Sequence, residues 1–368
     1  MRISWLIDVQ APYREPMYAA IARRADLQVN FFFREEKVRH MVWREHPEYA
    51  SRVVGSIRLP LPAAIRRRLD HDAAVLAPGV PRGLLDDTDV LGLPGWDQPL
   101  YLGMARRAIR RGVPYVSYYE STLASRQFTS GPVHEVRSWF FRHAGAVVVP
   151  GPAAREAAVA NGIDPGRVVE SVNSIDLDTF GQRPRALRVG TSTAGPHRFA
   201  YVGQLIPRKN VAALLDALAL SDSSTLEIAG DGVEAATLAA QAQARGLGGR
   251  VRFLGFLDEA GIVELLARSH TLVLPSTEEV YGMTALEAHV AGCQVVVSDR
   301  AGVAASLTDT EGVWVVEPTV DGLVKGLDAA VRGWDGWLTP DPTVASPDRT
   351  ADDVIRAAEL ALARRSGR

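Results

Sequence analysis

Apolar runs of strand length alternate with helical stretches in two successive halves of this 368-residue chain. The run at residues 3–9 opens the first half, and the alternation restarts at Phe199–Val202. Residues 183–197 between them are rich in Arg, Gly, Ser, Thr and Pro, which is typical of a linker. Strands that alternate with helices build parallel sheets covered on both faces. The sequence therefore predicts an α/β protein with two doubly wound parallel-sheet domains, residues 1–182 and 198–347.

The segment Pro275–Gly292 carries the densest chemical pattern of the chain. Before it, Thr271–Leu274 is a short apolar run of the kind found in buried strands. After Gly282, the apolar positions have helical spacing up to Gly292, a typical helix end. The residues between strand and helix thus form a loop at the carboxyl end of a parallel strand. Backbone N–H groups and the helix dipole favour an anion at such a place.

Two carboxylates flank this expected anion site, Glu279 in the loop and Glu287 in the helix. Eight positions along one helix rotate a side chain by about 80°, so two helical residues at this spacing would not share a face. With Glu279 in the loop, the two side chains can border one cleft from different sides and accept hydrogen bonds from sugar or ribose hydroxyls. The alternative is a pair of solvated carboxylates without a ligand.

This segment resembles the signature of the retaining, nucleotide-sugar-dependent glycosyltransferases of family four, also called glycosyl transferases group 1. That signature reads Pro-Ser, two residues, Glu, any residue, an aromatic residue, Gly, four residues and Glu-Ala. Every fixed position of it is matched here, by Pro275, Ser276, Glu279, Tyr281, Gly282, Glu287 and Ala288.

The resemblance implies a GT-B fold, in which two Rossmann-like domains face each other across a central cleft. Residues 1–182 would bind the acceptor and residues 198–347 the nucleotide-sugar donor. A C-terminal helix at 348–368 would cross back to pack on the N-terminal domain.

A basic turn follows the first strand of the second half, and it starts at Gly203. Arg208 and Lys209 lie just ahead of a helix N-terminus, where two cations suit a diphosphate. The family pattern is Gly-Arg-Leu, three residues and Lys, so Lys209 matches, whereas Gln204 replaces the usual arginine. The resemblance assigns catalysis to Glu279, Lys209 and Arg208, and donor binding to Gly203, Gln204, Gly230, Gly232, Phe256, Tyr281, Gly282, Met283 and Glu287.

Three loops of the N-terminal half are candidates for the acceptor side. Where family members often carry a glycine pair, this chain has Tyr13 and Arg14. Trp96 and Asp97 follow another strand, either to contact a sugar acceptor or as a tryptophan packed on the sheet. Tyr119 and Glu120 stand where the family often has a His-Asp pair, so the role of that histidine is unassigned.

Composition and charge exclude several classes of protein. The single cysteine, Cys293, excludes an intrachain disulfide and a multi-cysteine metal site. A sequence pI of about 6.5 argues against nucleic acid as a partner. No apolar run reaches the roughly 18 residues of a membrane span, and the start lacks a signal peptide, which favours a cytoplasmic protein. Leu59–Leu69 mixes apolar and basic residues, as in a peripheral membrane-surface segment or a solvated loop.

The resemblance implies transfer of a sugar from a nucleotide sugar to a hydroxyl acceptor with retention, by front-face displacement. The acceptor class, a glycan, a lipid-linked sugar or a small natural product, stays open. No carboxylate cluster has metal-ligand spacing, and we expect no metal or other cofactor. The alternatives are a nucleotide-sugar 2-epimerase on the same architecture and an inactive homologue that binds nucleotide sugars.

Overall fold

The computed structural model describes residues 1–33, 47–60, 73–76, 78–81, 83–123, 128–188, 195–221 and 224–366. Its residue contacts divide the chain into two compact units. The first unit comprises Met1–Ser174 together with Ser346–Arg368, and the second comprises Ile175–Ala345. Each unit has its own sheet and its own hydrophobic core.

The first unit is built on a seven-stranded sheet with the order β3-β2-β1-β6-β7-β8-β9. Every adjacent pair in it is parallel. The strands are β1 (Arg2–Ile7), β2 (Asp26–Phe31), β3 (Ala50–Val53), β6 (Val90–Leu93), β7 (Tyr115–Tyr118), β8 (Ala146–Pro150) and β9 (Val168–Ser171). The strand order reverses between β1 and β6, which is where doubly wound sheets bind ligands.

Helices cover both faces of this sheet, because the strands are apolar on both sides. The helices are α1 (Glu15–Ala22), α3 (Pro99–Arg111), α4 (Gly131–His143), α5 (Pro152–Ala160) and α13 (Pro347–Ser366), with short 3-10 turns η1 (Pro12–Arg14) and η3 (Pro165–Arg167). Side chains of α1 and α13 share a core with Trp5 and Val29, whereas α3, α4 and α5 share the other with Leu91 and Leu93. A separate antiparallel hairpin pairs β4 (Ile57–Pro60) with β5 (Ala73–Leu76).

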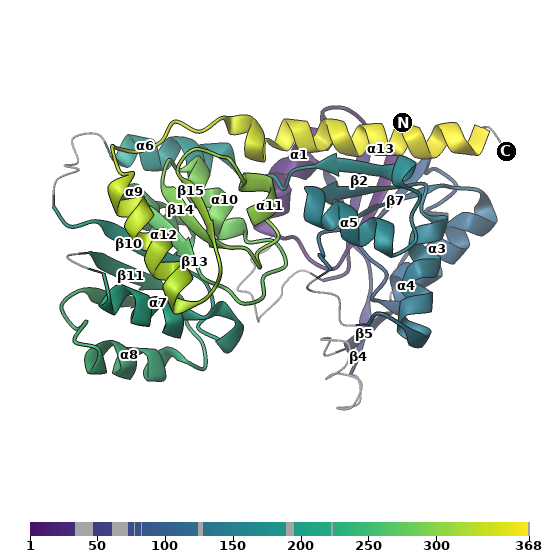
Figure 1. The fold of residues 1–368 in the computed structure, drawn as a ribbon. Coiled ribbons are helices and arrows are strands. Elements are labelled where there is room, and N and C mark those ends of the chain that lie inside the picture. Colours follow the sequence, from purple (N-terminus) through teal and green to yellow (C-terminus); the bar gives the residue numbers. More distant parts are fainter. Residues whose placement is uncertain are drawn as a thin grey trace. The chain divides into compact units, whose positions relative to one another are not determined.

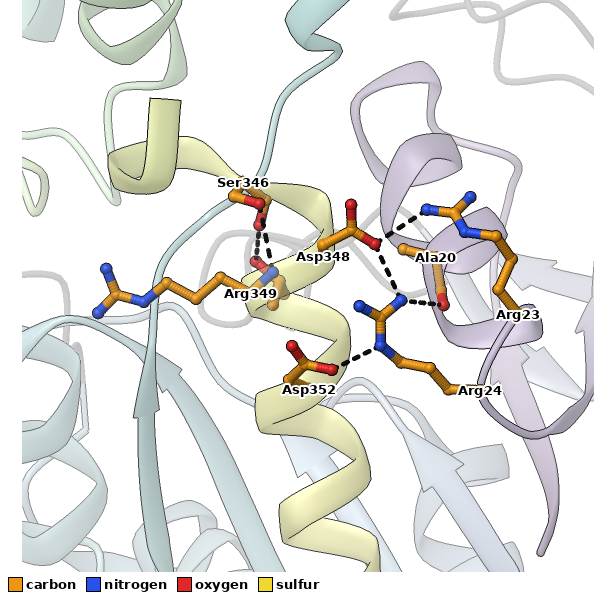
Figure 2. A network of polar contacts seen from close by, with 8 residues as sticks. Ala20, Arg23, Arg24, Ser346, Asp348, Arg349 and Asp352 are labelled. Carbon is orange, nitrogen blue, oxygen red and sulfur yellow. Dashed lines mark hydrogen bonds and ion pairs between the residues drawn. The ribbon is translucent and has the colours of Figure 1, made fainter. Parts of the chain in front are cut away.

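The last helix, α13, packs along α1 although some 330 positions separate them in sequence (Figure 1). Figure 2 shows the polar side of this contact. Asp348 accepts hydrogen bonds from Arg23 at 3.0 Å and from Arg24 at 2.9 Å, and Asp352 accepts from Arg24 at 2.5 Å. The two arginines lower the pKa of Asp348. Exposed ion pairs of this kind contribute little energy, so the apolar residues of α13 supply most of the attachment.

The second unit is built on a six-stranded parallel sheet with the order β12-β11-β10-β13-β14-β15. The strands are β10 (Arg198–Val202), β11 (Thr225–Ala229), β12 (Val251–Gly255), β13 (Thr271–Leu274), β14 (Gln294–Ser298) and β15 (Val313–Val316). Its helices are η4 (Asp178–Gln182), α6 (Arg183–Leu187), η5 (Pro207–Lys209), α7 (Val211–Ala219), α8 (Ala235–Ala244), α9 (Glu259–Arg268), α10 (Met283–Val290), α11 (Ala304–Leu307), α12 (Val320–Arg332) and η6 (Pro342–Ala345). This is the strand order of a Rossmann fold, with the reversal between β10 and β13.

The two units meet in sequence at Ser174 and Ile175, ahead of the expected linker at 183–197. Ile175 and Phe180 are buried in the core of the second unit, which explains why the division falls before them. The described part of the expected linker is also tied to this unit. Arg188 is buried and donates hydrogen bonds to the carbonyl oxygens of Ala267 at 2.9 Å and Leu266 at 2.8 Å.

Most of the apolar and basic segment expected at Leu59–Leu69 lies outside the described residues. Within the described part of the chain, no helix combines the length and the apolar character needed to cross a bilayer.

Candidate active site

Three loops of the second unit meet at the carboxyl edge of its sheet. They follow β10, β11 and β13, the strands on both sides of the point where the strand order reverses. Most of the residues proposed for the donor lie on these loops. The edge therefore collects them from positions 203–232 and 275–287, which all belong to the second unit.

Lys209 and Glu279 contact each other at this edge. The ammonium of Lys209 donates a hydrogen bond to Oε2 of Glu279. Each side chain keeps only 12% of its surface exposed. The loss of solvent screening strengthens the attraction between the two charges, although both ions also lose hydration. The basic turn and the glutamate loop, both expected to be functional, are thus joined through their charged groups.

Asn210, which was not among the expected functional residues, holds the basic turn in place. Its backbone is left-handed, with φ 56° and ψ 33°, a conformation that asparagine tolerates better than most residues. Its side-chain amide donates to the carbonyl oxygens of Pro275 at 3.1 Å and Pro318 at 2.9 Å. These bonds connect the turn after β10 to the loops after β13 and β15. An asparagine directly before a helix was the available signal.

Arg208 is bonded to the same glutamate loop. Its backbone carbonyl accepts from the N–H of Thr277 at 2.9 Å, and its guanidinium donates to the carbonyl oxygen of Glu278 at 3.3 Å. The guanidinium remains partly exposed and retains further donors for a ligand. The backbone hydrogen bond fixes the position of the Arg208 main chain, while its long side chain can still turn toward an anion.

The amino end of α10 presents unpaired backbone donors beside these cations. Gly282 precedes the helix with φ 105°, and a Cβ there would lie 2.7 Å from Leu274 Cδ2. Glycine is therefore required for both conformation and space. The N–H groups of Gly282, Met283 and Thr284 have no acceptor among the residues that the structure describes. Together with the helix dipole they form an anion site.

Glu287 lies in the second turn of α10, partly buried. Burial and the nearby charge of Glu259 raise its pKa to about 7. No hydrogen-bond donor or cation contacts its carboxylate within the described part of the chain. A desolvated carboxylate without a partner is costly for the folded protein, and it gains most from a ligand that donates hydrogen bonds.

The glycines of the edge allow the loops to touch each other. A Cβ at Gly230 would lie 1.8 Å from the carbonyl oxygen of Gly203, and one at Gly232 would lie 2.3 Å from that of Leu205. The N–H of Gly203 donates to Ala229 at 3.0 Å. Gly203, Gly230 and Gly232 are thus explained by backbone packing between the loops after β10 and β11.

The remaining donor-side candidates take different positions. Gln204 is exposed, and its backbone carbonyl accepts from the hydroxyl of Tyr201 at 2.8 Å. Phe256 keeps 61% of its surface exposed just after β12. Tyr281 is buried in the core, and its carbonyl accepts from the N–H of Val303 at 2.8 Å. Tyr281 therefore positions the loop, whereas Gln204 and Phe256 offer exposed surface to a ligand.

In the first unit, three acceptor-side candidates form one group at the carboxyl edge of the sheet. Arg14 is buried and pairs with Glu120 at 3.2 Å. Its guanidinium also lies over the rings of Tyr13 and Tyr118, 5.4 Å and 5.2 Å from their centroids. Burial opposes the charge of Arg14 most strongly, but Glu120 and the nearby tyrosines together outweigh it, and the pKa of Arg14 is raised. The structure thus brings Tyr13, Arg14 and Glu120 together.

Trp96 and Tyr119 do not join this group. Trp96 packs on the core, and the guanidinium of Arg137 lies 5.4 Å from its ring centroid. Asp97 beside it is exposed. Tyr119 is buried, packs edge-on against Phe141 at 4.7 Å and accepts a hydrogen bond from Asn161 at 3.0 Å. Tyr119 and Trp96 therefore have the surroundings of core residues.

The charged groups of the edge favour binding of a polyanion that also carries hydroxyl groups. Two cations and a helix N-terminus lie within one short stretch of surface, beside two carboxylates. In the described residues, no group of three or more His, Cys, Asp or Glu side chains is arranged to hold a metal ion.

Comparisons with known proteins identify a family and similar folds. The family model described as glycosyl transferases group 1 matches residues 183–335, which include all three loops. Glycogen synthase of Mycobacterium tuberculosis is 32% identical over 248 residues, 63% of this chain and 56% of that protein. Phosphatidyl-myo-inositol mannosyltransferase of Mycobacterium leprae is 30% identical over 263 residues, 69% of this chain and 66% of that protein. The chain thus spans about half to two thirds of the length of these curated relatives.

Among solved structures, HepE of Anabaena in complex with UDP is similar over the full length of both chains, with a TM-score of 0.69 at 19% identity. This likeness confirms the GT-B fold expected from the sequence, two Rossmann-like domains in one chain.

Proposed function

Because residues 183–335 belong to the glycosyl transferases group 1, we propose that this protein transfers a sugar from a nucleotide-sugar donor to a hydroxyl acceptor. The observation that carries the proposal is the meeting of Arg208, Lys209, Glu279 and the amino end of α10 at one sheet edge. Such an edge supplies both a diphosphate site and carboxylates for a sugar. HepE is described in complex with UDP, so uridine donors are the first to test.

The diphosphate of the donor binds at the basic turn and at the N–H groups of Gly282, Met283 and Thr284. Charge builds on its leaving oxygen as the sugar departs, and fixed donors stabilise that charge without having to reorganise. Lys209 and Arg208 provide the cationic part of this stabilisation. The two cations and the helix end offset the charge that a metal ion would neutralise, and we propose that no metal is required.

Glu287 holds the ribose of the donor. Its carboxylate has a raised pKa and no partner in the described structure, so two hydroxyl donors would restore the hydrogen bonds lost on folding. Binding would favour the ionised carboxylate and lower its pKa. The exposed ring of Phe256, at the end of β12, lies where a base can stack at the same sheet edge.

Glu279 acts on the sugar itself, in a front-face displacement with retention. The departing phosphate oxygen takes the acceptor proton, while Glu279 orients the sugar and stabilises positive charge at the anomeric carbon. Lys209 must then serve both Glu279 and the leaving phosphate, which the contact between them makes possible.

Tyr13, Arg14 and Glu120 of the first unit recognise the acceptor. Arg14 and Glu120 neutralise each other, and such a pair offers donors and acceptors to hydroxyl groups without net charge. This chemistry fits a polyhydroxylated acceptor.

The proposal is tested by incubating the protein with a panel of nucleotide sugars and measuring release of the nucleoside diphosphate. We expect release with at least one donor, and its loss in Lys209→Ala. Lys325→Ala, an exposed lysine on α12, is the matched control. Sugar released as a free 2-epimer would identify an epimerase instead, and tight nucleotide binding without release from any donor would identify an inactive homologue.

A further inference from the structure

A basic groove lies at the amino-terminal edge of the first unit's sheet, the edge opposite to Arg14 and Glu120. Its volume is about 530 Å³. The groove is bordered by the ends of α3, α4 and α13 and by the residues just before β7, β8 and β9. Its polar lining includes Arg142, His143, Arg167, Arg364 and Arg365, and no carboxylate is among the lining residues in the described part of the chain. The floor also has apolar atoms, from Ile109, Pro114 and Ala361.

Arg167 of the groove is held by hydrogen bonds to the backbone and has one N–H donor without an acceptor. Arg167 donates through Nη1 to the carbonyl oxygens of Arg142 at 3.2 Å and Ala144 at 3.3 Å. Its Nε is buried, lies 3.8 Å from Oδ2 of Asp164 and has no hydrogen-bond acceptor in the described residues. A buried N–H without an acceptor costs free energy that a ligand oxygen would recover.

The other arginines of the groove have only long ion-pair contacts or none. Arg142 is 3.9 Å from Glu135, and Arg364 is 3.5 Å from Asp164, which also lies 3.8 Å from Arg167. These distances are too long for strong charge-assisted hydrogen bonds. Arg365 has no ion-pair partner among the described residues.

Helix dipoles explain only part of this arrangement, since basic residues commonly end a helix. The neighbouring hollow at the same edge provides the comparison. There, the aspartates outnumber the arginines: Asp26, Asp86, Asp87 and Asp89 lie beside Arg2, Arg111 and Arg365. Arg365 borders both hollows. The excess of positive charge is therefore particular to the groove between α4 and α13.

We propose that this groove binds a small anion with two or more phosphate groups, at a site separate from the donor site. Guanidinium groups match phosphate oxygens in pairs, and several converge here on one concavity. The volume falls within the range of small-molecule sites. The apolar floor accommodates the organic part of such a ligand.

The test is calorimetry with inorganic tripolyphosphate on the full chain. Lys209→Ala serves as the background, because the donor site would also bind this probe. We expect one tripolyphosphate per chain in that background. Adding Arg142→Gln and Arg364→Gln should weaken binding by about tenfold or more. Arg365→Gln, whose side chain makes no described contact that folding needs, should by itself weaken binding several-fold.

The matched control is Arg356→Gln, because Arg356 is an exposed arginine on the same helix, pairs with Asp353 at 2.9 Å and does not line the groove. It should leave the affinity unchanged, and raised salt should weaken binding in the background protein. Equal affinity in the Arg365→Gln variant and the background would overturn the proposal. Binding only to vesicles that contain anionic lipid, with none to tripolyphosphate, would overturn it as well, because the face would then be a membrane surface.

Discussion

Lys209 and Glu279, seventy positions apart in sequence, share a hydrogen bond at the edge of the second sheet. The proposed function assigns Lys209 to the leaving phosphate and Glu279 to the sugar. Their contact means that each charge is neutralised while no donor is bound. A donor phosphate must then compete with Glu279 for the ammonium of Lys209, and the two groups become available together.

This pairing predicts coupled effects on stability. Lys209→Ala leaves the carboxylate of Glu279 largely buried without a cation, so we expect the free energy of unfolding to fall by about 1–3 kcal/mol. Glu279→Gln removes the charge that Lys209 neutralises, and the double variant should lose less than the sum of the two single losses. Urea unfolding of all four proteins measures the coupling, and strict additivity would mean that the contact contributes nothing.

The role proposed for Glu279 predicts a kinetic separation. Glu279→Gln should reduce turnover by about 10²-fold or more while affinity for the nucleoside diphosphate changes little, since the interaction is made mainly in the transition state. Glu278→Gln, its exposed neighbour, is the control. A variant that lost nucleotide affinity and kept its turnover would place Glu279 at the nucleotide instead.

Substitution of Glu287 should have opposite effects on stability and on nucleotide binding. The pKa of Glu287 in the folded protein is about 7, above the usual 4.5. The protonated side chain therefore favours the folded state at low pH, and this contribution to the free energy of unfolding is lost as pH rises through 7. Glu287→Gln should therefore stabilise the ligand-free protein at pH 8, by about 1–2 kcal/mol. It should also weaken binding of the nucleoside diphosphate by about tenfold or more.

The pH dependence of nucleoside diphosphate binding also tests the role of Glu287. Affinity for the nucleoside diphosphate should rise between pH 6 and pH 8 more steeply in the parent than in Glu287→Gln, because the ionised carboxylate accepts the hydroxyl hydrogen bonds. Glu264→Gln, an exposed glutamate on α9, is expected to behave like the parent in both measurements. Identical affinities of parent and Glu287→Gln at pH 8 would assign Glu287 no ligand.

A histidine cluster at the opposite edge of the second sheet predicts acid sensitivity. His270 stacks on Trp334 at 4.2 Å, and its Nδ1 accepts from the N–H of Arg198 at 3.3 Å. Burial is the main cause that lowers the pKa of His270, to about 3. The nearby charges of Arg198, His197 and Arg188 contribute to this lowering, with Arg198 the strongest of the three. The folded protein therefore holds this histidine neutral at pH values where the unfolded chain protonates it.

Stability should consequently fall as pH drops below 6.5, by about 2 kcal/mol for His270 between pH 6.5 and pH 5. His270→Phe retains the stacking on Trp334 but cannot titrate, so its unfolding free energy should vary less over that interval. Urea unfolding at several pH values measures the slopes. Equal slopes of unfolding free energy against pH in the parent and in His270→Phe would exclude His270 as the source of the acid sensitivity. The same substitution at the exposed His143 is the control.

The sequence predicted the parts of this structure that follow from local pattern. The strand, loop and helix around Glu279 were expected because an apolar run, a proline and a glycine mark their limits, and the structure has β13 and α10 there. The GT-B fold followed from the resemblance of that segment. The position of Gly282, with its positive φ, is a direct consequence of the same turn.

Contacts between distant segments were not predictable in this way. Nothing in the spacing indicates that Lys209 reaches Glu279, or that Asn210 bonds the carbonyl oxygens of Pro275 and Pro318. Nor does it distinguish Tyr119, which turns into the core, from its neighbour Glu120, which pairs with Arg14. Such outcomes depend on packing between elements far apart in sequence.

Sugar transfer with retention leaves its mark in the anomeric configuration of the product. Proton NMR of the sugar, recorded as it is transferred to an acceptor or to water, reports the configuration at the anomeric carbon. Front-face displacement predicts that an α-linked donor gives an α-configured product before mutarotation sets in. A β-configured initial product would contradict front-face displacement and the role given to Glu279.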